Sequence, residues 1–336
     1  MFAQETKDTW DKLSAVSGLA VALIGASATG VFAWRQRKTE NHRNSREIAI
    51  QRVQTVQTFL PHLASKNELE KRAALLAIRQ LDDAELASKL ATLFGGEGAV
   101  SALATIARSP NQQDANFARR SLGELLDMLR LSVVLVRVRV DPDQTTTFEA
   151  SGFVVRSDGL IVTVHLIMLN VEPNSEFSVQ FPNEASPRKA QIVQTFPKLG
   201  IALLQVEGES FHALPIEEKL PTVGEEIFAL HHPRGEGVPE EAWTPVLGEV
   251  LGTSLEPDEP NMQETLFIKA TLEGWGESGR GGFAGMPTVN SGGQVVGMGH
   301  SSASSGGTAP LASLLIPAKN ASLAIASISS DSDTRE

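Results

Sequence analysis

The stretch ASGFVVRSDGLIVTVH, residues 150–165, decides the fold class of the C-terminal half of this 336-residue chain. Two runs of β-prone residues, 152–156 and 160–163, flank Asp158-Gly159. An Asp-Gly pair between two such runs is a strong hairpin signal, because these residues tolerate the left-handed backbone of a tight turn. The stretch therefore predicts two antiparallel strands joined by a short connection.

Strand patterns continue on both sides of this hairpin. Before it, Val134, Val136 and Val138 alternate with Leu135 and Arg137, which is the two-residue period of a strand. Many short strands separated by turn residues are typical of an all-β barrel or sandwich. We therefore expect a β-rich domain over residues 131–322. Its further strands are expected at 175–181, 188–196, 201–206, 225–230, 245–253, 265–271, 293–299 and 313–317.

The same segments carry a family resemblance, in order along the chain. Residues 150–163 resemble the opening of trypsin-like proteases of the HtrA type, and the IALLQV of residues 201–206 resembles the strand that follows their acid. Residues 223–235 and the LIP of residues 315–317 resemble two later family stretches. The resemblance implies a chymotrypsin-like double β-barrel without the PDZ domain that HtrA proteins usually append. It also implies that a homo-oligomer, often a trimer in that family, is one option.

The nucleophile loop of the family reads G-x-S-G-x-P, and two registers are open for it here. In the first, Gly282 to Pro287 is that loop, Ala284 takes the serine position, and the backbone N–H groups of Gly282 and Ala284 form the oxyanion hole. In the second, Ser291 within Asn-Ser-Gly-Gly is the nucleophile. The second register lacks the preceding glycine and the following proline. We therefore expect Ser291 in a hairpin turn and Ala284 at the nucleophile position.

The two partners of a serine nucleophile also depart from the family pattern. The family places its histidine three residues after a strand-ending threonine, whereas His165 lies two residues after Thr163. His165 is the candidate base: either one residue of the family pattern is deleted before it, or Leu166 occupies the histidine position. The acid position, directly before Ile201, is Gly200, which offers no carboxylate to orient an imidazole. The resemblance therefore implies a trypsin-like fold whose catalytic residues are degenerate.

Composition excludes several other classes of site. The chain has no cysteine, which excludes disulfides, thiolate catalysis and zinc–cysteine sites. Its formal net charge of −11 argues against nucleic-acid binding. Adjacent His231 and His232 on an extended segment point to opposite faces, so we expect them to be structural. We expect no metal and no cofactor.

The N-terminal region contains a candidate membrane span. Residues 13–34 carry no charge, and about 20 mainly apolar residues suffice to cross a bilayer as a helix. A signal peptide or a buried helix are the alternatives, although the preceding tail, residues 1–12, lacks the basic character of a signal peptide. Because basic residues follow Trp34, the positive-inside rule places the bulk of the chain in the cytoplasm; a periplasmic location is the alternative.

Residues 35–130 form the expected α-helical segment, a stack of short helices, and residues 323–336 an expected disordered tail. We expect helices over 68–81, 82–94, 97–108 and 112–130, the first opened by a capping box at Ser65–Glu68 and the second capped by Asp82. The segment is either a spacer or a partner-binding surface.

Three functions follow from the sequence. The first is a membrane-anchored trypsin-like serine protease homologue that is catalytically inactive and binds a peptide or protein partner. The second is an active serine endopeptidase in which alanine was substituted for serine at 284. The third is a membrane scaffold that acts through its helical segment.

Overall fold

A computed structural model describes the chain over residues 56–81, 83–140, 147–169, 171–230, 232, 245–256, 265–272, 284–302 and 313–333. The chain divides into two compact units, residues 1–66 and residues 67–336. The predicted membrane span at 13–34 lies outside the described residues. Within the described ranges, no helix has both the length and the apolar character needed to cross a membrane.

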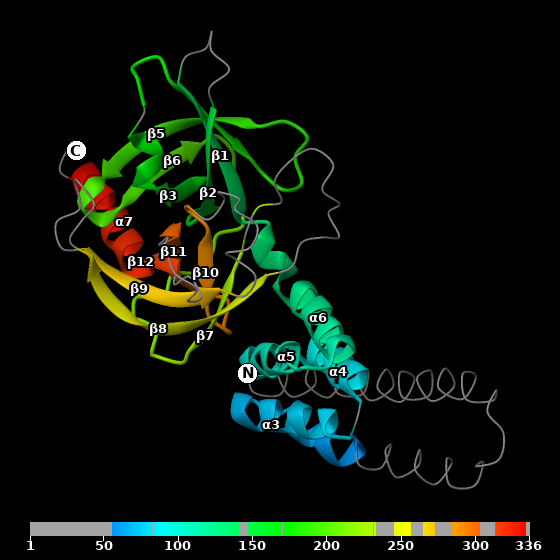
Figure 1. The fold of residues 1–336 in the computed structure, drawn as a ribbon. Coiled ribbons are helices and arrows are strands. Elements are labelled where there is room, and N and C mark those ends of the chain that lie inside the picture. The colour runs from blue at the N-terminus through cyan, green and yellow to red at the C-terminus, as the bar shows by residue number, and fades with distance from the viewer. Residues whose placement is uncertain are drawn as a thin grey trace, which may run out of the picture. The chain divides into compact units, whose positions relative to one another are not determined.

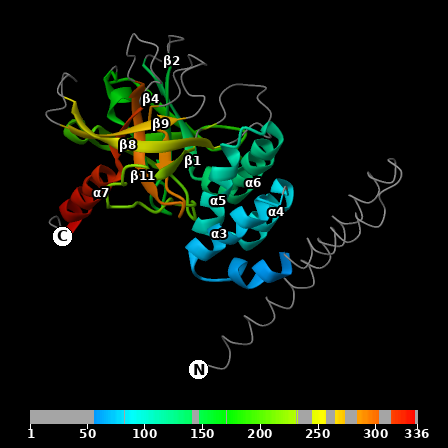
Figure 2. The ribbon, with the colours of Figure 1, turned by 60° about the horizontal axis from the view of Figure 1, so that its bottom comes forward.

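The second unit begins with four helices, which form the helical segment of the fold: α3 (Glu68–Arg79), α4 (Ala84–Phe94), α5 (Glu97–Ala107) and α6 (Gln112–Arg130). Each begins and ends close to the predicted bounds. Alanine and leucine side chains between the helices form their core, which includes Leu75, Ala87, Leu103 and Leu122. Figure 1 and Figure 2 show these helices packed side by side.

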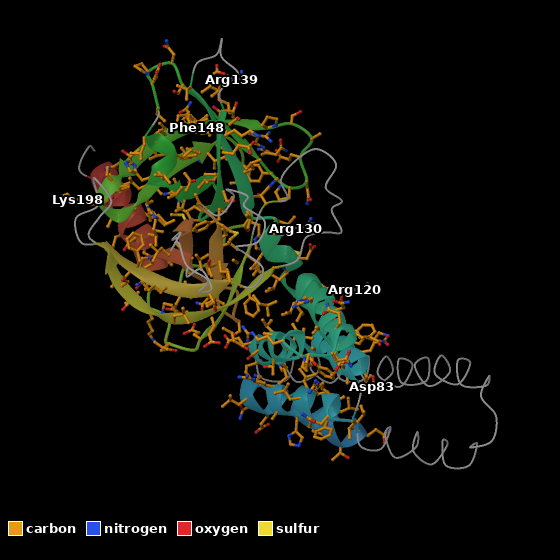
Figure 3. All side chains as sticks on the ribbon, viewed as in Figure 1. Asp83, Arg120, Arg130, Arg139, Phe148 and Lys198 are labelled. Atoms are coloured by element: carbon orange, nitrogen blue, oxygen red, sulfur yellow. The ribbon has the colours of Figure 1, made fainter. Side chains whose placement is uncertain are left out.

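The caps of two helices differ from the prediction. The N-cap of α3 is Asn67, whose side-chain oxygen accepts from the N–H groups of Leu69 and Glu70; the predicted box at Ser65 is wrong by two residues. The N-cap of α4 is Asp83, labelled in Figure 3, which accepts from Leu86 N–H at 3.0 Å. Asparagine and aspartate are among the preferred N-cap residues, because their side-chain oxygen accepts from a free N–H group of the first turn. In each helix the residue directly before the first helical residue therefore acts as the cap.

Twelve strands follow and close into two barrels, which Figure 1 shows in green and in yellow to orange. The first barrel closes in the order β1-β2-β3-β6-β5-β4 and the second in the order β10-β11-β12-β9-β8-β7. This confirms the predicted double β-barrel. The strands of the first barrel are β1 (Val133–Arg139), β2 (Thr147–Val154), β3 (Leu160–Val164), β4 (Glu176–Gln180), β5 (Arg188–Phe196) and β6 (Ile201–Val206). Those of the second are β7 (Glu226–Ala229), β8 (Val246–Glu256), β9 (Thr265–Leu272), β10 (Pro287–Val289), β11 (Val295–Ser302) and β12 (Ser313–Pro317).

The predicted hairpin at Asp158-Gly159 is confirmed. β2 and β3 pair antiparallel, with Val154 opposite Ile161. Gly159 has φ +92°, and a Cβ at this position would lie 2.5 Å from the carbonyl oxygen of Val206. Glycine is therefore required here both by the left-handed backbone and by the close approach of β6.

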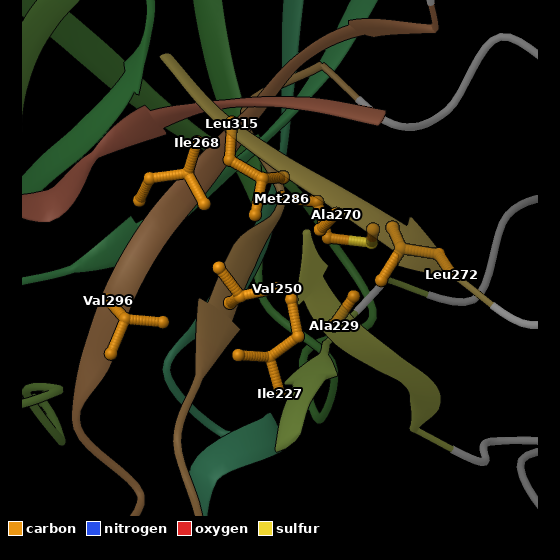
Figure 4. Packing of buried hydrophobic residues seen from close by; sticks show 9 residues of the cluster. All are labelled: Ile227, Ala229, Val250, Ile268, Ala270, Leu272, Met286, Val296 and Leu315. Carbon is orange, nitrogen blue, oxygen red and sulfur yellow. The ribbon is translucent and has the colours of Figure 1, made fainter. Parts of the chain in front are cut away.

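The core of the second barrel is a compact apolar cluster (Figure 4). Its side chains come from β7, β8, β9, β11 and β12 and from Met286, directly before β10, so the cluster packs segments that are far apart in the sequence. The nine members are Ile227, Ala229, Val250, Ile268, Ala270, Leu272, Met286, Val296 and Leu315. Met286 lies within the predicted nucleophile loop, which ties that loop to the core.

The predicted disordered tail is wrong for residues 323–333, where α7 (Ala318–Asp333) continues from β12. Ala318, Ala321 and Ala324 recur every three residues and are buried, so the helix has an apolar face despite its serine- and aspartate-rich end. The buried side chain of Asn320 donates to the carbonyl of Leu199 at 3.2 Å. α7 thereby contacts the first barrel beside Gly200.

Candidate active site

The candidate base lies at the end of β3. His165 opens the short 3₁₀ helix η1 (His165–Met168), and its backbone N–H donates to the carbonyl of Gly200 at 2.8 Å. The structure therefore brings the predicted base and the predicted acid position together, through the pairing of Val164 with Ile201 in neighbouring strands. This proximity arises from the order of strands in the first barrel.

Gly200 offers a backbone oxygen where the family pattern has a carboxylate. It ends the 3₁₀ helix η2 (Pro197–Leu199) in the left-handed conformation, with φ 70° and ψ 19°. Only glycine adopts this conformation freely, although aspartate and asparagine tolerate it better than other residues. The residue therefore has a conformational reason to be glycine.

The Nδ1 atom of the His165 imidazole is buried, and no described residue forms a hydrogen bond with it. Burial lowers the pKa of His165 below its ordinary value, because desolvation disfavours the charged ring. A carboxylate on Nδ1 would have the opposite effect. Burial therefore favours the neutral imidazole, and Gly200 does not supply the carboxylate that fixes the tautomer in a catalytic triad.

The predicted nucleophile position is anchored to the first barrel. The carbonyl of Ala284 accepts from Ser151 N–H of β2 at 2.8 Å. The next residue, Gly285, has φ +80°, and a Cβ there would lie 1.8 Å from the carbonyl oxygen of Ser151. That same oxygen accepts from the hydroxyl of Thr163 at 2.8 Å, two residues before His165. Ala284 and His165 are thus connected through the β2–β3 ladder.

Ser291 lies in a different place. It belongs to the turn between β10 and β11, as the first register predicts. In this turn the side-chain oxygen of Asn290 accepts from Gly292 N–H and Gln294 N–H, each at 3.0 Å. Gly292 faces Glu97 of α5 and Gly293 faces Leu129 of α6. Ser291 therefore sits in a structural turn beside the helical segment.

The structure does not describe every residue singled out in the sequence. Gly282, the other predicted oxyanion donor, and His231 lie outside the described residues. His232 is buried. Among the described residues, no group of three or more histidine and acidic side chains is arranged to hold a metal ion.

The sequence positions of this site fall inside a recognised domain. Residues 150–298 match the sequence model of the trypsin-like peptidase domain. Together with the two closed barrels, this match identifies the β-rich part of the chain as a trypsin-like peptidase domain. The match includes His165, Gly200 and Ala284.

The comparisons with individual proteins are more distant. The active form of the Rv3671c protease from M. tuberculosis is 18% identical, with a TM-score of 0.46 over 59% of this chain and 80% of that chain. A serine-to-alanine mutant of the same protease, in its inactive form, is 20% identical, with a TM-score of 0.47 over 61% and 90%. Among curated proteins, none matches this chain.

Proposed function

We propose that this protein is a membrane-anchored, catalytically inactive homologue of trypsin-like serine proteases that binds a peptide or protein partner. The observation that carries the proposal is the anchored position of Ala284, whose carbonyl is bonded to Ser151 of β2. A methyl group cannot attack a carbonyl carbon, whatever surrounds it. Hydrolysis by the standard serine mechanism is therefore not expected.

The surroundings of His165 support loss of catalysis beyond the nucleophile alone. Its Nδ1 is buried and unbonded, and its neighbour Gly200 contributes a backbone carbonyl to the His165 N–H. In a triad the carboxylate holds the imidazole in the tautomer that accepts the serine proton, and its loss costs several orders of magnitude in rate. A serine restored at 284 would meet a base without an orienter.

The test compares the purified chain with Ala284→Ser. Each is treated with a serine-reactive fluorophosphonate probe and with a denatured protein substrate, after circular dichroism has verified folding. The proposal expects neither protein to be labelled or to cleave. If Ala284→Ser is labelled and cleaves, the protein is the endopeptidase of the alternative reading, and the inactive reading fails.

The binding part of the proposal needs its own test. We expect an extended peptide to bind beside Ala284, since backbone N–H and C=O groups next to this position can pair with the backbone of an extended peptide. A random peptide library is passed over the immobilised chain and over Ala284→Arg, whose long side chain fills the approach to this position. Peptides retained by the chain and lost by Ala284→Arg support the proposal. Equal retention by both would show that binding occurs elsewhere.

Membrane attachment is proposed for residues 13–34, from their uncharged composition and length. We expect the full chain to remain in the membrane fraction after alkaline carbonate extraction, and a chain lacking 13–34 to be released. We propose that the trypsin-like domain lies on the cytoplasmic side, because basic residues follow Trp34. Protease digestion of sealed membrane vesicles tests this: a domain degraded only from the lumenal or periplasmic side would contradict the orientation.

A further inference from the structure

The turn between β10 and β11 is closed by hydrogen bonds among its own residues. Besides the two bonds to the Asn290 side chain, the N–H of Asn290 donates to Gln294 O and that of Gly293 to Asn290 O, each at 3.0 Å. Gly293 has φ +76°. We name Asn290–Gln294 the docking turn. With this many internal hydrogen bonds, the turn moves as one piece.

The docking turn rests on the helical segment. A Cβ built on Gly292 would lie 2.8 Å from the carboxylate oxygen Oε1 of Glu97, the first residue of α5. A Cβ built on Gly293 would lie 3.2 Å from Cδ1 of Leu129, in the last turn of α6. The two glycines therefore let the turn sit directly on the ends of two helices.

A second contact joins the same helix to the same barrel. Glu226 of β7 accepts from Ser101 of α5 at 2.6 Å and from Arg108, the residue that follows α5, at 2.8 Å. Arg108 also donates to the carbonyl of Gly248 in β8 at 3.2 Å. α5 and the residue after it therefore contact both β7 and the docking turn. β10 pairs with β7 on one side and with β11 on the other, and the docking turn joins β10 to β11.

β10 connects the docking turn to the candidate site. It has three residues, all buried, and spans about 10 Å at the usual rise of a strand. Its first residue follows Met286 of the barrel core, and Gly285 is held by a 2.7 Å bond to Gly299 of β11. A short, fully packed strand transmits a displacement at one end to the other, because a packed core does not deform continuously.

From this arrangement we propose that the helical segment holds the loop Ala284–Met286 in place through the docking turn and β10. The segment is then a regulator of the candidate site: a partner that shifts α5 or α6 changes the backbone to which Ala284 belongs. This inference goes beyond the proposed function and does not depend on whether the site binds a peptide or has lost catalysis. It also gives the helical segment a role other than that of a spacer.

A charge placed on Gly292 tests the proposal. Gly292 has no left-handed φ, so a side chain is compatible with its backbone. Gly292→Asp brings a second carboxylate against Glu97, whereas Gly292→Asn adds a group of the same size without the charge. The matched rescue is Gly292→Asp combined with Glu97→Gln, which removes the repulsion.

The readout is amide hydrogen exchange of the full chain, followed by mass spectrometry for peptides covering 284–289 and 290–294. We expect both peptides to exchange about tenfold faster in Gly292→Asp than in Gly292→Asn, and to return to within about twofold in the rescue. Neither catalysis nor a ligand enters this measurement.

Three results would overturn the proposal. The first is faster exchange at 290–294 alone, which means that the turn moves without the loop. The second is an equal effect of aspartate and asparagine, and the third is no effect on either peptide. If Gly292→Asp does not fold, Leu129→Ala replaces it and is compared with Leu125→Ala, a half-buried leucine one turn earlier in the same helix. If residues 284–289 exchange faster in Leu129→Ala but not in Leu125→Ala, the proposal is supported. If these residues exchange at the same rate in both variants, the proposal is overturned.

Discussion

Gly285→Ala is the substitution that tests most directly how the candidate loop is held. A Cβ at this position would lie 1.8 Å from the carbonyl oxygen of Ser151 and 3.1 Å from the hydroxyl of Thr163. The nearest atom belongs to backbone, so it cannot rotate away as a flexible side chain does. The loop and β2 must separate, and the bond from Ser151 N–H to Ala284 O must lengthen or break.

The cost has two parts that a control separates. A left-handed φ costs an alanine about 1–2 kcal/mol relative to glycine. Forcing extra volume into a packed contact costs about 1–3 kcal/mol more. Gly224 has nearly the same φ, +82° against +80°, but a Cβ there would meet nothing within 4 Å. Gly224→Ala therefore carries only the cost of the left-handed φ, whereas Gly285→Ala carries that cost and the cost of the steric overlap.

Urea unfolding followed by far-ultraviolet circular dichroism measures the difference. We expect Gly224→Ala to lower the free energy of unfolding by about 1 kcal/mol and Gly285→Ala by about 3 kcal/mol. If the two variants unfold at the same urea concentration, Gly285 is not packed against β2 in solution. The anchoring of Ala284 would then be wrong as well.

Three other predictions follow from single contacts. Burial lowers the pKa of His165, so the folded protein binds a proton at this residue less readily than the unfolded chain does. The free energy of unfolding should therefore decrease as the pH falls below the unfolded pKa of about 6.5. In His165→Gln, the melting temperature should decrease less over the same pH range. Asp83→Ala removes the N-cap of α4 and should cost about 1 kcal/mol in thermal unfolding, whereas Asp83→Asn, which still accepts from Leu86 N–H, should cost less than half of that. Glu226→Gln removes the charge that Arg108 contacts and should lower stability by about 1 kcal/mol. Arg108→Gln should cost less in the Glu226→Gln background than in the unchanged chain, where it loses this contact as well as its bond to the carbonyl of Gly248; full additivity in this double-mutant cycle would show that the pair does not form.

The sequence predicted the strands best where β-prone runs were bounded by turn residues. The bounds of β5, β6 and β12 are those expected, and the four helices of the helical segment begin and end within about two residues of prediction. β10 was missed because it has three residues, starts with proline and is buried on every side, so it shows no alternation. α7 was missed because its serine and aspartate content hides the three alanines that pack.

The site was predictable as positions but not as contacts. Motif order placed Ala284, His165 and Gly200, since each adjoins a recognisable strand or loop. The contacts that join them, Ala284 with Ser151 and His165 with Gly200, are backbone bonds between segments 133 and 35 residues apart. Almost every residue carries the same backbone N–H and C=O groups, so the pattern of side chains does not predict which of these groups form hydrogen bonds with each other. The docking turn illustrates the same limit, since its glycines predict a turn and not the helices against which it rests.

Under the proposed loss of catalysis, Gly200 is a second position, besides Ala284, at which the triad pattern fails. Its left-handed backbone ends η2, and its carbonyl oxygen already bonds the N–H of His165. An aspartate at 200 would retain that backbone bond at a cost of about 1 kcal/mol for the left-handed φ. Asn320 of α7 donates to the carbonyl of Leu199, directly before this position. Under the proposed loss of catalysis, a serine at 284 alone would therefore still meet an imidazole without a carboxylate at 200.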